Sequence, residues 1–551
     1  MQKKQAYNPF LPLNEYVPDG EPHVFDGRVY IYGSHDREGG YTFCMDDYVT
    51  YSAPVDDLSD WRYEGVIYKA QQDPDYDKLP YMYAPDVVRG NDGKYYLYYC
   101  LSGDYGNGGY TWHISVAVAD NPAGPYEYLG FVKNPDGTPM KRYICFDPAV
   151  LNDNGVIRLY YGTQYPFEEE AKLAGDQAKL EEVLKNEMVM FGKTKEELLS
   201  YPDSVNGAIM AVLDDDMLTV KEAPKHIIPY ETKGTDFEEH PFFEASSMRK
   251  VNGRYYFVYS SWQNHELCYA TSDYPDKDFV YGGTIISNGD IGYQGRSGKD
   301  KLNMTGTTHG SIELIGDQWY VFFHRLTHKS DYSRQACAEK ITIEADGSIK
   351  QVELTSCGMN DGPLKGEGTY PAVICCNLTN GHMPHGCNSM YTISFPNVNN
   401  KGEDRFIAEI GDGTLIGYKY FDFAQGKKLS LVVREENDET KVVYDGPVRV
   451  DERVQLEMAG YSEAKLSQGS GEGDAASADE ANASETTTTD GNYFELRTVL
   501  GGERIATINV DGADSTWQTF TADAVIPEGK QAIFLTYHGN KKMQLLELAF
   551  S

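Results

Sequence analysis

Glu244 is the residue of this sequence best placed to donate a proton. It stands between Phe242 and Phe243 on one side and Ala245 on the other. A carboxyl group among apolar neighbours is desolvated, which disfavours its charged form and raises its pKa. A carboxylic acid that stays protonated near neutral pH can act as a general acid. The local sequence therefore predicts acid–base chemistry at this position.

The segment around Glu244 is one of five similar segments. In each, a short strand-like run leads to a turn glycine, and an aromatic strand follows, which predicts a β-hairpin. The intervals between the turn glycines are 66, 62, 98 and 63 residues. The interval of 98 contains a predicted helical insertion of roughly 35 residues, without which the spacing would be near-constant. Such regular repetition of β-hairpins is typical of a β-propeller, so we expect five blades. The turn glycines are Gly27, Gly93, Gly155, Gly253 and Gly316.

Each of these hairpins carries one polar residue six to nine positions before its turn glycine. The first strand of each propeller blade lines the central axis, so these side chains should converge there from all five blades. Four carboxylates and one imidazole around one axis indicate a catalytic site more than a solvated channel. The five residues are Glu21, Asp86, Asp147, Glu244 and His309.

Six short motifs, taken together and in order, resemble glycoside hydrolase family 43 over about residues 7–345. The resemblance implies a five-bladed β-propeller and three acidic residues, namely a general base, a general acid and an aspartate that tunes the pKa of the acid. Matching positions imply that Glu244 is the acid and Asp147 the tuning aspartate. The motifs are Asn8-Pro9, Glu21-Pro22-His23, Ala84-Pro85-Asp86, Phe146-Asp147-Pro148, Phe242-Phe243-Glu244-Ala245-Ser246 and His309-Gly310.

The general base has two candidates in this sequence, Asp19 and Glu21. The family usually has Asp-Pro at this place, whereas Asp19 and Glu21 here flank Gly20 before Pro22. Residue type favours Asp19, and the position relative to Pro22 favours Glu21. Residues i and i+2 share a strand face, so both could reach the site. The hairpin register favours Glu21, and Asp19 stays the alternative.

The resemblance implies further site residues. The family inverts anomeric configuration, so we expect the acid and base carboxyl groups roughly 6.5–9.5 Å apart. Arg334 resembles the arginine that contacts substrate, and His309 resembles the axial histidine that holds a cation or water. The chemistry requires no cofactor, although a structural Ca²⁺ in the channel or in the C-terminal domain is compatible with the resemblance. The expected substrate-binding residues are His35, Asp36, Asp86, Trp112, Gln164, Trp262 and Arg334.

The length of 551 residues predicts more than one domain. We expect the all-β propeller over 1–350, with a helical insertion at about 167–200 where apolar residues recur at helical spacing. Short alternating strands over 366–551 predict a jelly-roll-like β-sandwich, which resembles carbohydrate-binding modules of family 6. Within it, residues 462–492 contain almost nothing apolar and are predicted to be mobile.

The formal net charge is −35, from 84 acidic and 49 basic residues. Such a surface repels nucleic acid and anionic membranes but does not hinder a neutral sugar, so the expected partner is an oligosaccharide. The nine cysteines form no paired CxxC pattern, and we expect reduced thiols. With no apolar run that suits a signal peptide or a membrane span, we expect a cytoplasmic protein. The sequence leaves the oligomeric state open.

These observations together favour an enzyme. The resemblance implies an exo-acting glycosidase that releases terminal α-L-arabinofuranose or β-D-xylose from plant-derived oligosaccharides. One alternative is an endo-acting arabinanase or xylanase of the same family. The other is a non-catalytic propeller that only binds carbohydrate, which would have no reason to direct carboxylates toward its axis.

Overall fold

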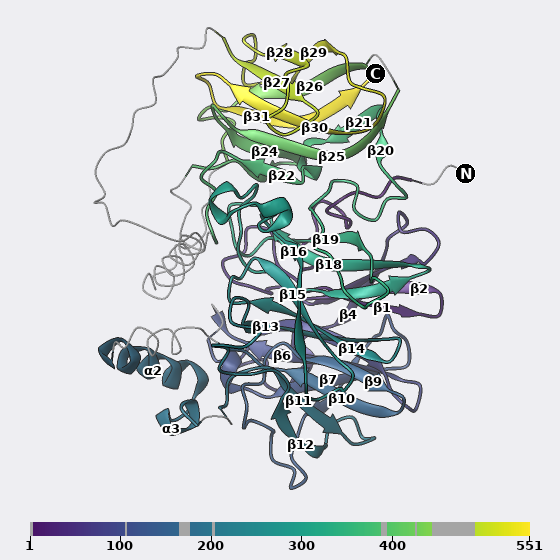
Figure 1. The fold of residues 1–551 in the computed structure, drawn as a ribbon, viewed down its shortest axis with the longest axis vertical. Helices are drawn as coiled ribbons and strands as arrows, with labels where there is room; N and C mark the ends of the chain where they lie inside the picture. Colours follow the sequence, from purple (N-terminus) through teal and green to yellow (C-terminus); the bar gives the residue numbers. More distant parts are fainter. Residues whose placement is uncertain are drawn as a thin grey trace. The chain divides into compact units, whose positions relative to one another are not determined.

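The computed structural model describes residues 4–104, 107–164, 177–200, 204–386, 394–424, 427–442 and 491–551 (Figure 1). The chain divides into two compact units. The first unit comprises Met1–Ser287, Gly306–Leu326 and Asp331–Glu353, and the second comprises Asn288–Thr305, Thr327–Ser330 and Leu354–Ser551. The segment 462–492, predicted to be mobile, lies outside the described residues except for its last two.

The first unit contains five antiparallel sheets, four with four strands and one with three. The first two sheets are β1 (Glu21–Phe25), β2 (Arg28–Tyr32), β3 (Tyr48–Pro54) and β4 (Arg62–Tyr68), then β5 (Tyr81–Arg89), β6 (Tyr95–Ser102), β7 (Ile114–Ala119) and β8 (Glu127–Phe131). The third is β9 (Ala149–Asp153), β10 (Val156–Tyr161), β11 (Ile209–Leu213) and β12 (Val220–His226). The last two are β13 (Phe242–Val251), β14 (Arg254–Ser261), β15 (Glu266–Ser272) and β16 (Val280–Ser287), then β17 (Ser311–Ile315), β18 (Gln318–Leu326) and β19 (Arg334–Ile341).

The first strands of the five sheets form a closed ring. β1 contacts β5, β5 contacts β9, β9 contacts β13, β13 contacts β17, and β17 contacts β1. The N-terminal segment joins the outer strand of the three-stranded sheet, where the Asn8 amide donates to the Ala338 carbonyl and accepts from the Ala338 N–H, both at 3.0 Å. The unit is therefore a five-bladed β-propeller, as the sequence predicts.

Local sequence explains the inner hairpins. The turn glycines predicted from the sequence all have left-handed φ, for example +80° at Gly27 and +88° at Gly253. Asp26 and Asn252, which precede them, are left-handed too, so both turns have the two positive φ angles typical of two-residue hairpin loops. Glycine adopts this conformation without steric cost, which is why each repeat carries one at this position.

Tyrosines fill much of the space between neighbouring blades. The chain has 43 tyrosines, and Tyr98 and Tyr99 are fully buried. Their hydroxyls still find acceptors, because Tyr98 donates to the Met217 carbonyl at 2.7 Å and Tyr99 to Asp73 at 2.6 Å. A tyrosine can thus fill the gap between two sheets while its polar end reaches a partner.

A helical insertion follows β10 in the third blade. It contains α2 (Gln177–Phe191) and α3 (Lys195–Leu198), and the Thr194 hydroxyl accepts a hydrogen bond from the Glu197 N–H to cap α3. Phe191 and Leu198 are buried in a cluster with Phe146, which directly precedes Asp147. The insertion thus packs beneath the chain segment that carries a predicted site residue. The short 3₁₀ helices are η1 (Ala70–Gln72), η3 (Gly109–Thr111), η4 (Tyr293–Gly295), η5 (Gly298–Asp300) and η6 (Ala372–Ile374).

The second unit is a β-sandwich of two six-stranded sheets. One sheet is β20 (Leu364–Lys365), β25 (Leu415–Phe423), β30 (Gly529–His538), β27 (Tyr493–Arg497) and β28 (Ala506–Asn509), with β22 (Asn377–Thr379) beside β25. The other is β23 (Asn397–Lys401), β24 (Asp404–Ile410), β31 (Met543–Phe550), β26 (Lys427–Glu435) and β29 (Gln518–Ala524), with β21 (Gly368–Pro371) beside β31. Phe421 of the first sheet packs on Phe550 of the second, with ring centroids 5.0 Å apart, so the core lies between the sheets.

None of the described helices is both long enough and apolar enough to cross a membrane.

Candidate active site

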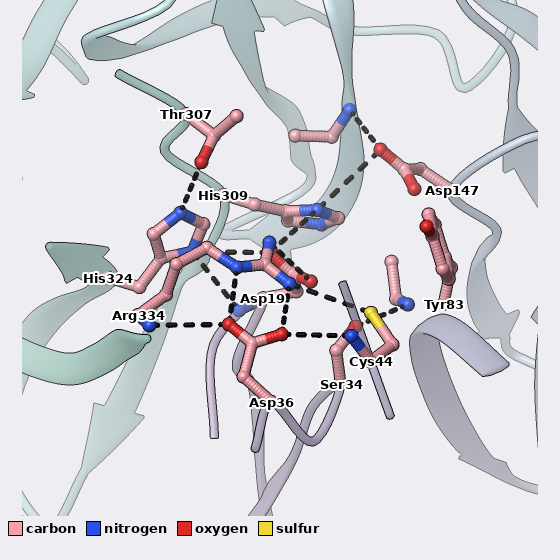
Figure 2. A network of polar contacts seen from close by, with 12 residues as sticks. Asp19, Ser34, Asp36, Cys44, Tyr83, Asp147, Thr307, His309, His324 and Arg334 are labelled. Atoms are coloured by element: carbon pink, nitrogen blue, oxygen red, sulfur yellow. Dashed lines mark hydrogen bonds and ion pairs between the residues drawn. The ribbon is translucent and has the colours of Figure 1, made fainter. Parts of the chain in front are cut away.

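The inner strands hold their polar residues in two layers along the axis. Gly20 and Gly310 form a parallel bridge, which places Asp19 and His309 side by side where β1 and β17 begin. Asp147 belongs to the same first layer, with its Oδ2 3.6 Å from His309 Nδ1 (Figure 2). Glu21 instead accepts a hydrogen bond from Ser247, three residues after Glu244, and so belongs to a second layer further along the strands.

Asp19 is surrounded by nitrogen atoms. Arg334 Nη1 lies 2.9 Å and 3.1 Å from its two carboxylate oxygens. His324 Nδ1 accepts a hydrogen bond from the Asp19 backbone N–H at 3.2 Å and lies at the same distance from Oδ1. Burial alone would raise the pKa of Asp19, but the charge of Arg334, followed by the contacts of His324, holds this pKa well below its usual value. Asp19 is therefore a carboxylate at neutral pH, able to accept a proton.

Arg334 is held by a second carboxylate as well. Its Nε lies 2.8 Å from Asp36 Oδ2, and its Nη2 lies 3.0 Å from Asp36 Oδ1 (Figure 2). Asp36 Oδ1 also accepts the Cys44 N–H at 3.0 Å, and the guanidinium lies over the Phe43 ring at 4.8 Å. The guanidinium N–H groups thus point at protein groups. Arg334 and Asp36 lie next to Asp19 in the first layer, and their direct contact with substrate stays a prediction.

Glu244 enters the site through an irregularity in β13. Regular pairing with β14 breaks between Glu244 and Ser247, and Ala245 has a φ of +67°. The Glu244 side chain stays partly exposed, so a substrate can reach it. The surrounding protein nevertheless desolvates the carboxyl, and together with the charge of Asp19, against the opposing effect of Arg334, this raises its pKa to about 8. Glu244 is therefore protonated at neutral pH, as expected of a general acid.

Asp147 connects the acid to the rest of the site. Its Oδ2 accepts a hydrogen bond from the backbone N–H of Ala245 at 3.0 Å, one residue from Glu244. Burial, then the charges of Glu244 and Asp19, raise the pKa of Asp147 well above its usual value. Its φ of +45° is left-handed, like the +57° of Asp19. A left-handed φ is uncommon outside glycine and often marks functional sites.

His309 lies between the acidic groups. Its Nδ1 is 3.6 Å from Asp147 Oδ2 and 3.9 Å from Asp19 Oδ1. Burial lowers the pKa of His309 to about 4, so the ring is neutral at pH 7. Among the described residues, the groupings of three potential ligand side chains are Glu21–His23–Asp86 and His240–Glu266–Cys268, and neither includes His309. Its role toward a cation stays a prediction.

The second layer is a separate charge network. Glu21 Oε2 lies 3.0 Å from Arg249 Nη2, and Arg249 Nε lies 3.0 Å from Glu313. Burial, opposed by Arg249 and reinforced by Asp86, raises the pKa of Glu21 to about 7. Glu21 is thus partly protonated near neutral pH, and its nearest cation is Arg249. The geometry therefore favours Asp19 over Glu21 as the base, and the choice between the two stays a prediction.

Asp86 is the other second-layer residue that the sequence places in the substrate site. Its Oδ1 lies 2.6 Å from His23 Nε2 and accepts the Val87 N–H at 2.7 Å. Its Oδ2 accepts the Val150 N–H at 2.7 Å. Both carboxylate oxygens are occupied by the protein itself, which fits a role in joining β1, β5 and β9 better than a contact with sugar.

The remaining pocket-wall candidates fall into two groups. Gln164 and Trp262 lie beside the acid, because the Gln164 N–H donates to the Phe243 carbonyl at 2.8 Å and Trp262 Nε1 donates to the Gln164 carbonyl at 3.0 Å. His35 does not join them, since its nitrogens contact the Asp47 carbonyl at 2.7 Å and Glu15 at 2.9 Å.

Trp112, like His35, does not join Gln164 and Trp262 beside the acid. Its Nε1 donates to Asp75 Oδ2 at 3.2 Å, and its ring lies against Lys78, Lys141 and His113, none of which belongs to the first layer.

Some members of the site were missed from the sequence. His324 contacts Asp19, and its Nε2 lies 3.3 Å from the Thr307 hydroxyl. Cys44 and Phe43 support the Asp36–Arg334 pair. His324 lies on β18, in an aromatic run, and its place in that run offered no signal of a site residue.

Comparisons with known proteins find a glycoside hydrolase family and several xylosidases or arabinosidases that resemble this chain. Residues 8–195 match the sequence model described as glycosyl hydrolases family 43. A xylosidase/arabinosidase of Thermoclostridium stercorarium is 40% identical over 564 residues, which covers 98% of this chain and 98% of the relative. A xylosidase/arabinosidase of Bacteroides ovatus is 31% identical and covers 62% of this chain and 97% of the relative. One similar solved structure is a β-xylosidase/α-arabinofuranosidase from a compost microbial metagenome, in complex with xylotriose and in a calcium-free form. It is 28% identical to this chain, and the match covers 64% of this chain and 97% of the solved chain, with a TM-score of 0.46.

Proposed function

The chain belongs to glycosyl hydrolase family 43, and on that premise we propose that it is an inverting, exo-acting glycosidase that releases terminal pentose from plant-derived oligosaccharides. The chain is a glycoside hydrolase of the arabinofuranosidase or xylosidase type. The pentose is α-L-arabinofuranose or β-D-xylose, and the names of the Thermoclostridium and Bacteroides relatives support this choice.

One observation carries the proposal, namely the opposite pKa shifts of two carboxyl groups in one site. Arg334 and His324 hold Asp19 in its charged form. Desolvation and the charge of Asp19 keep Glu244 protonated up to a pH of about 8. Two carboxyl groups whose surroundings push their pKa values apart are suited to act as base and acid. A propeller that only binds carbohydrate has no need of such a pair.

The reaction follows from these protonation states. Glu244 donates its proton to the glycosidic oxygen as the bond to the leaving group breaks. Asp19 takes a proton from a water molecule that attacks the anomeric carbon from the opposite face, which inverts the configuration. Room for this water requires a carboxyl separation of roughly 6.5–9.5 Å, which stays a prediction. Asp147 positions the backbone next to Glu244 through its hydrogen bond to the Ala245 N–H, while desolvation and the charge of Asp19 keep the acid protonated.

Hydrolysis by two carboxyl groups needs no cofactor. A structural Ca²⁺ in the channel would need a suitable set of oxygen donors among the residues there. Glu21, His23 and Asp86 bring ligand atoms within 4.8 Å of one another, and Glu21 Oε1 is buried without a hydrogen-bond partner among the described residues. Ca²⁺ takes six to eight oxygen ligands, whereas this group includes a histidine and stands beside the guanidinium of Arg249. The donor set therefore fits Ca²⁺ poorly.

The second unit is proposed to bind carbohydrate in the manner of the family 6-like modules that its sequence resembles. Its two-sheet architecture supports this reading. Retention of the full-length Glu244→Gln variant on insoluble arabinoxylan tests it, with and without Trp517→Ala in the sandwich. Equal retention of both proteins would argue against a role for this aromatic residue.

We also propose a cytoplasmic location. Cys44, Cys100, Cys145, Cys268 and Cys337 are buried and form no disulfide, which suits a reducing compartment. Cell fractionation with an activity assay tests this proposal. Activity confined to the medium would contradict it.

The proposed activity is tested with aryl β-D-xylosides and aryl α-L-arabinofuranosides. We expect hydrolysis of at least one class, with the inverted anomer formed first as followed by proton NMR. From a linear oligosaccharide we expect the monosaccharide as the first product. Internal fragments would indicate the endo-acting alternative, and binding without turnover of any pentoside would indicate the non-catalytic one.

A further inference from the structure

Trp112 lies on the same face of the propeller as the acid site. The first strand of each blade begins at the acid layer and runs away from it, and the second strand is antiparallel and returns. The connection between β6 and β7, which carries Trp112, therefore emerges on the acid-site face. Two ammonium groups lie against the indole, with Lys141 Nζ at 4.1 Å and Lys78 Nζ at 5.2 Å from a Trp112 ring centroid.

These two ammonium groups share a single nearby carboxylate. Lys78 Nζ lies 2.7 Å from Asp75 Oδ1, and Asp75 Oδ2 accepts the indole N–H of Trp112 at 3.2 Å. Lys141 has no carboxylate within 4.0 Å in the part of the chain that the structure describes. Burial and, less strongly, the charge of Lys78 lower the pKa of Lys141. Among the described residues, two ammonium groups thus face one carboxylate, which leaves a local excess of positive charge in a chain of net charge −35.

An imidazole without hydrogen bonds stands next to the same indole. His113 is 4% exposed, and within the described residues neither of its ring nitrogens has a hydrogen-bond partner. Its ring lies 5.5 Å from that of Trp112, and its Nε2 is 3.8 Å from Asp75 Oδ2. Buried polar groups are normally satisfied, so an unsatisfied imidazole beside two ammonium groups indicates that a polar ligand belongs here.

The helical insertion fixes the chain segment that carries Lys141. Lys193, which follows α2, donates hydrogen bonds to the carbonyls of Lys141 at 2.5 Å and Arg142 at 2.9 Å. The segment that carries Lys141 is thus fixed by an element that departs from the repeat of the propeller. Cation–π contact with Trp112 orients both ammonium groups.

We propose that Lys141 and Lys78, oriented by Trp112 and flanked by His113, form a subsite for the carboxylate of a uronic acid unit in the oligosaccharide substrate. The subsite rests on the proposed function, because an acid-site face that receives oligosaccharides is where a charged sugar would meet these ammonium groups. A carboxylate between the two cations would balance their charge, and His113 could donate a hydrogen bond to it. The neutral pentose is then cleaved at Glu244 while an acidic unit of the same molecule is held at Lys141.

The test compares the affinities of two oligosaccharides of equal length, one with a glucuronic acid branch and one without. Titration calorimetry uses the full chain with Glu244→Gln, so that binding occurs without turnover. We expect the acidic ligand to bind roughly twofold to thirtyfold more tightly, the range that two exposed ion pairs supply. Lys141→Gln should remove most of this preference, and 0.5 M salt should reduce it because screening weakens surface charge pairs.

The matched control is Lys277→Gln, because Lys277 Nζ also lies over an aromatic ring, that of Tyr274, at 4.4 Å. This variant should keep the preference for the acidic ligand. Equal affinities for the acidic and neutral ligands, or an equal effect of the two lysine substitutions, would overturn the proposal. Displacement of the acidic ligand by the same concentration of inorganic sulfate would also overturn it, since the site would then take any anion. Hydrolysis of aryl pentosides by the unmodified chain tests the proposed function separately.

Discussion

Arg334 Nη1 lies within hydrogen-bond distance of both carboxylate oxygens of Asp19, at 2.9 Å and 3.1 Å. The Nε and Nη2 atoms of the same guanidinium contact the carboxylate of Asp36. The charge of this buried cation keeps Asp19 ionised, and its contacts fix the direction in which Asp19 can accept a proton. This pairing is the basis for the proposal that Asp19 is the base, and Asp19 in turn helps keep Glu244 protonated.

Replacing Arg334 by methionine should reduce kcat and move the acid limb of the pH–rate profile upward. The charge of Arg334 lowers the pKa of Asp19, so its loss raises that pKa, and the base is then protonated at a higher pH. In the unmodified enzyme the acid limb should lie below about pH 4, the usual value for an aspartate. The measurement is kcat/KM on an aryl pentoside between pH 3 and 9. Arg62→Met, in an exposed pair with Glu64, is the control, and an acid limb that stays in place in Arg334→Met would contradict the pairing argument.

Replacing Glu244 by glutamine should remove the general acid. Loss of acid catalysis costs about 10²–10⁴-fold, and the loss should be largest for oligosaccharides, whose leaving groups need a proton. An activated aryl pentoside, with a good leaving group, should lose less. A Glu244→Gln variant within about threefold of the unmodified enzyme on an oligosaccharide, far inside that range, would exclude Glu244 as the acid.

The pH dependence on the alkaline side follows from the same residue. The acid must be protonated to act, and the pKa of Glu244 is raised to about 8. Activity should therefore fall as the pH rises through about 8, and Glu244→Gln should lack this limb. The check is kcat/KM against pH for both proteins on an activated aryl pentoside. An alkaline limb that survives the substitution would assign it to another group.

The fold was readable from the sequence because its signals are local. Each inner hairpin is marked by a turn glycine with a left-handed φ, and a turn of this kind depends on the residues at the turn itself. Five such hairpins at even spacing are enough to predict five blades. The helices α2 and α3 lie where apolar residues recur at helical spacing.

The site was less readable because its geometry depends on irregular strands and distant partners. Counting from the turn glycine placed Glu21 in phase with Glu244, but β1 has 5 residues whereas β13 has 10 and a break in its register. The left-handed φ of Asp19 and Ala245 could not be predicted from the sequence, because neither residue is a glycine. Arg334 reaches Asp19 across 315 residues of sequence, and only the closed ring brings them together.

Replacing Phe191 by alanine should loosen the helical insertion. Phe191 is 1% exposed, packs on Tyr110 with ring centroids 5.5 Å apart, and shares its cluster with Phe146, next to Asp147. Removing a buried phenylalanine side chain typically costs about 3–5 kcal/mol. Hydrogen exchange should rise first in 177–200. The value of kcat should fall because the loosened packing around Phe146 displaces Asp147. Val189→Ala, at an 81% exposed position of the same helix, is the control, and equal exchange in both variants would contradict the packing argument.

Replacing Asp19 by alanine should abolish water activation, and added azide should restore turnover. Azide is a small anion that needs no general base, so it can enter the space left by the carboxylate and attack the anomeric carbon directly. Glu21→Gln should retain far more activity, because Glu21 faces Arg249 and Ser247 and not the first-layer residues. Its effect should appear as lower stability above pH 7, since Arg249 would lose the charge of one of its two carboxylate partners. The measurements are product formation with and without azide for Asp19→Ala, Glu21→Gln and Glu21→Ala, and denaturant unfolding for Glu21→Gln. If azide rescued Glu21→Ala and not Asp19→Ala, the base would be Glu21 and the first layer would serve only to bind the sugar.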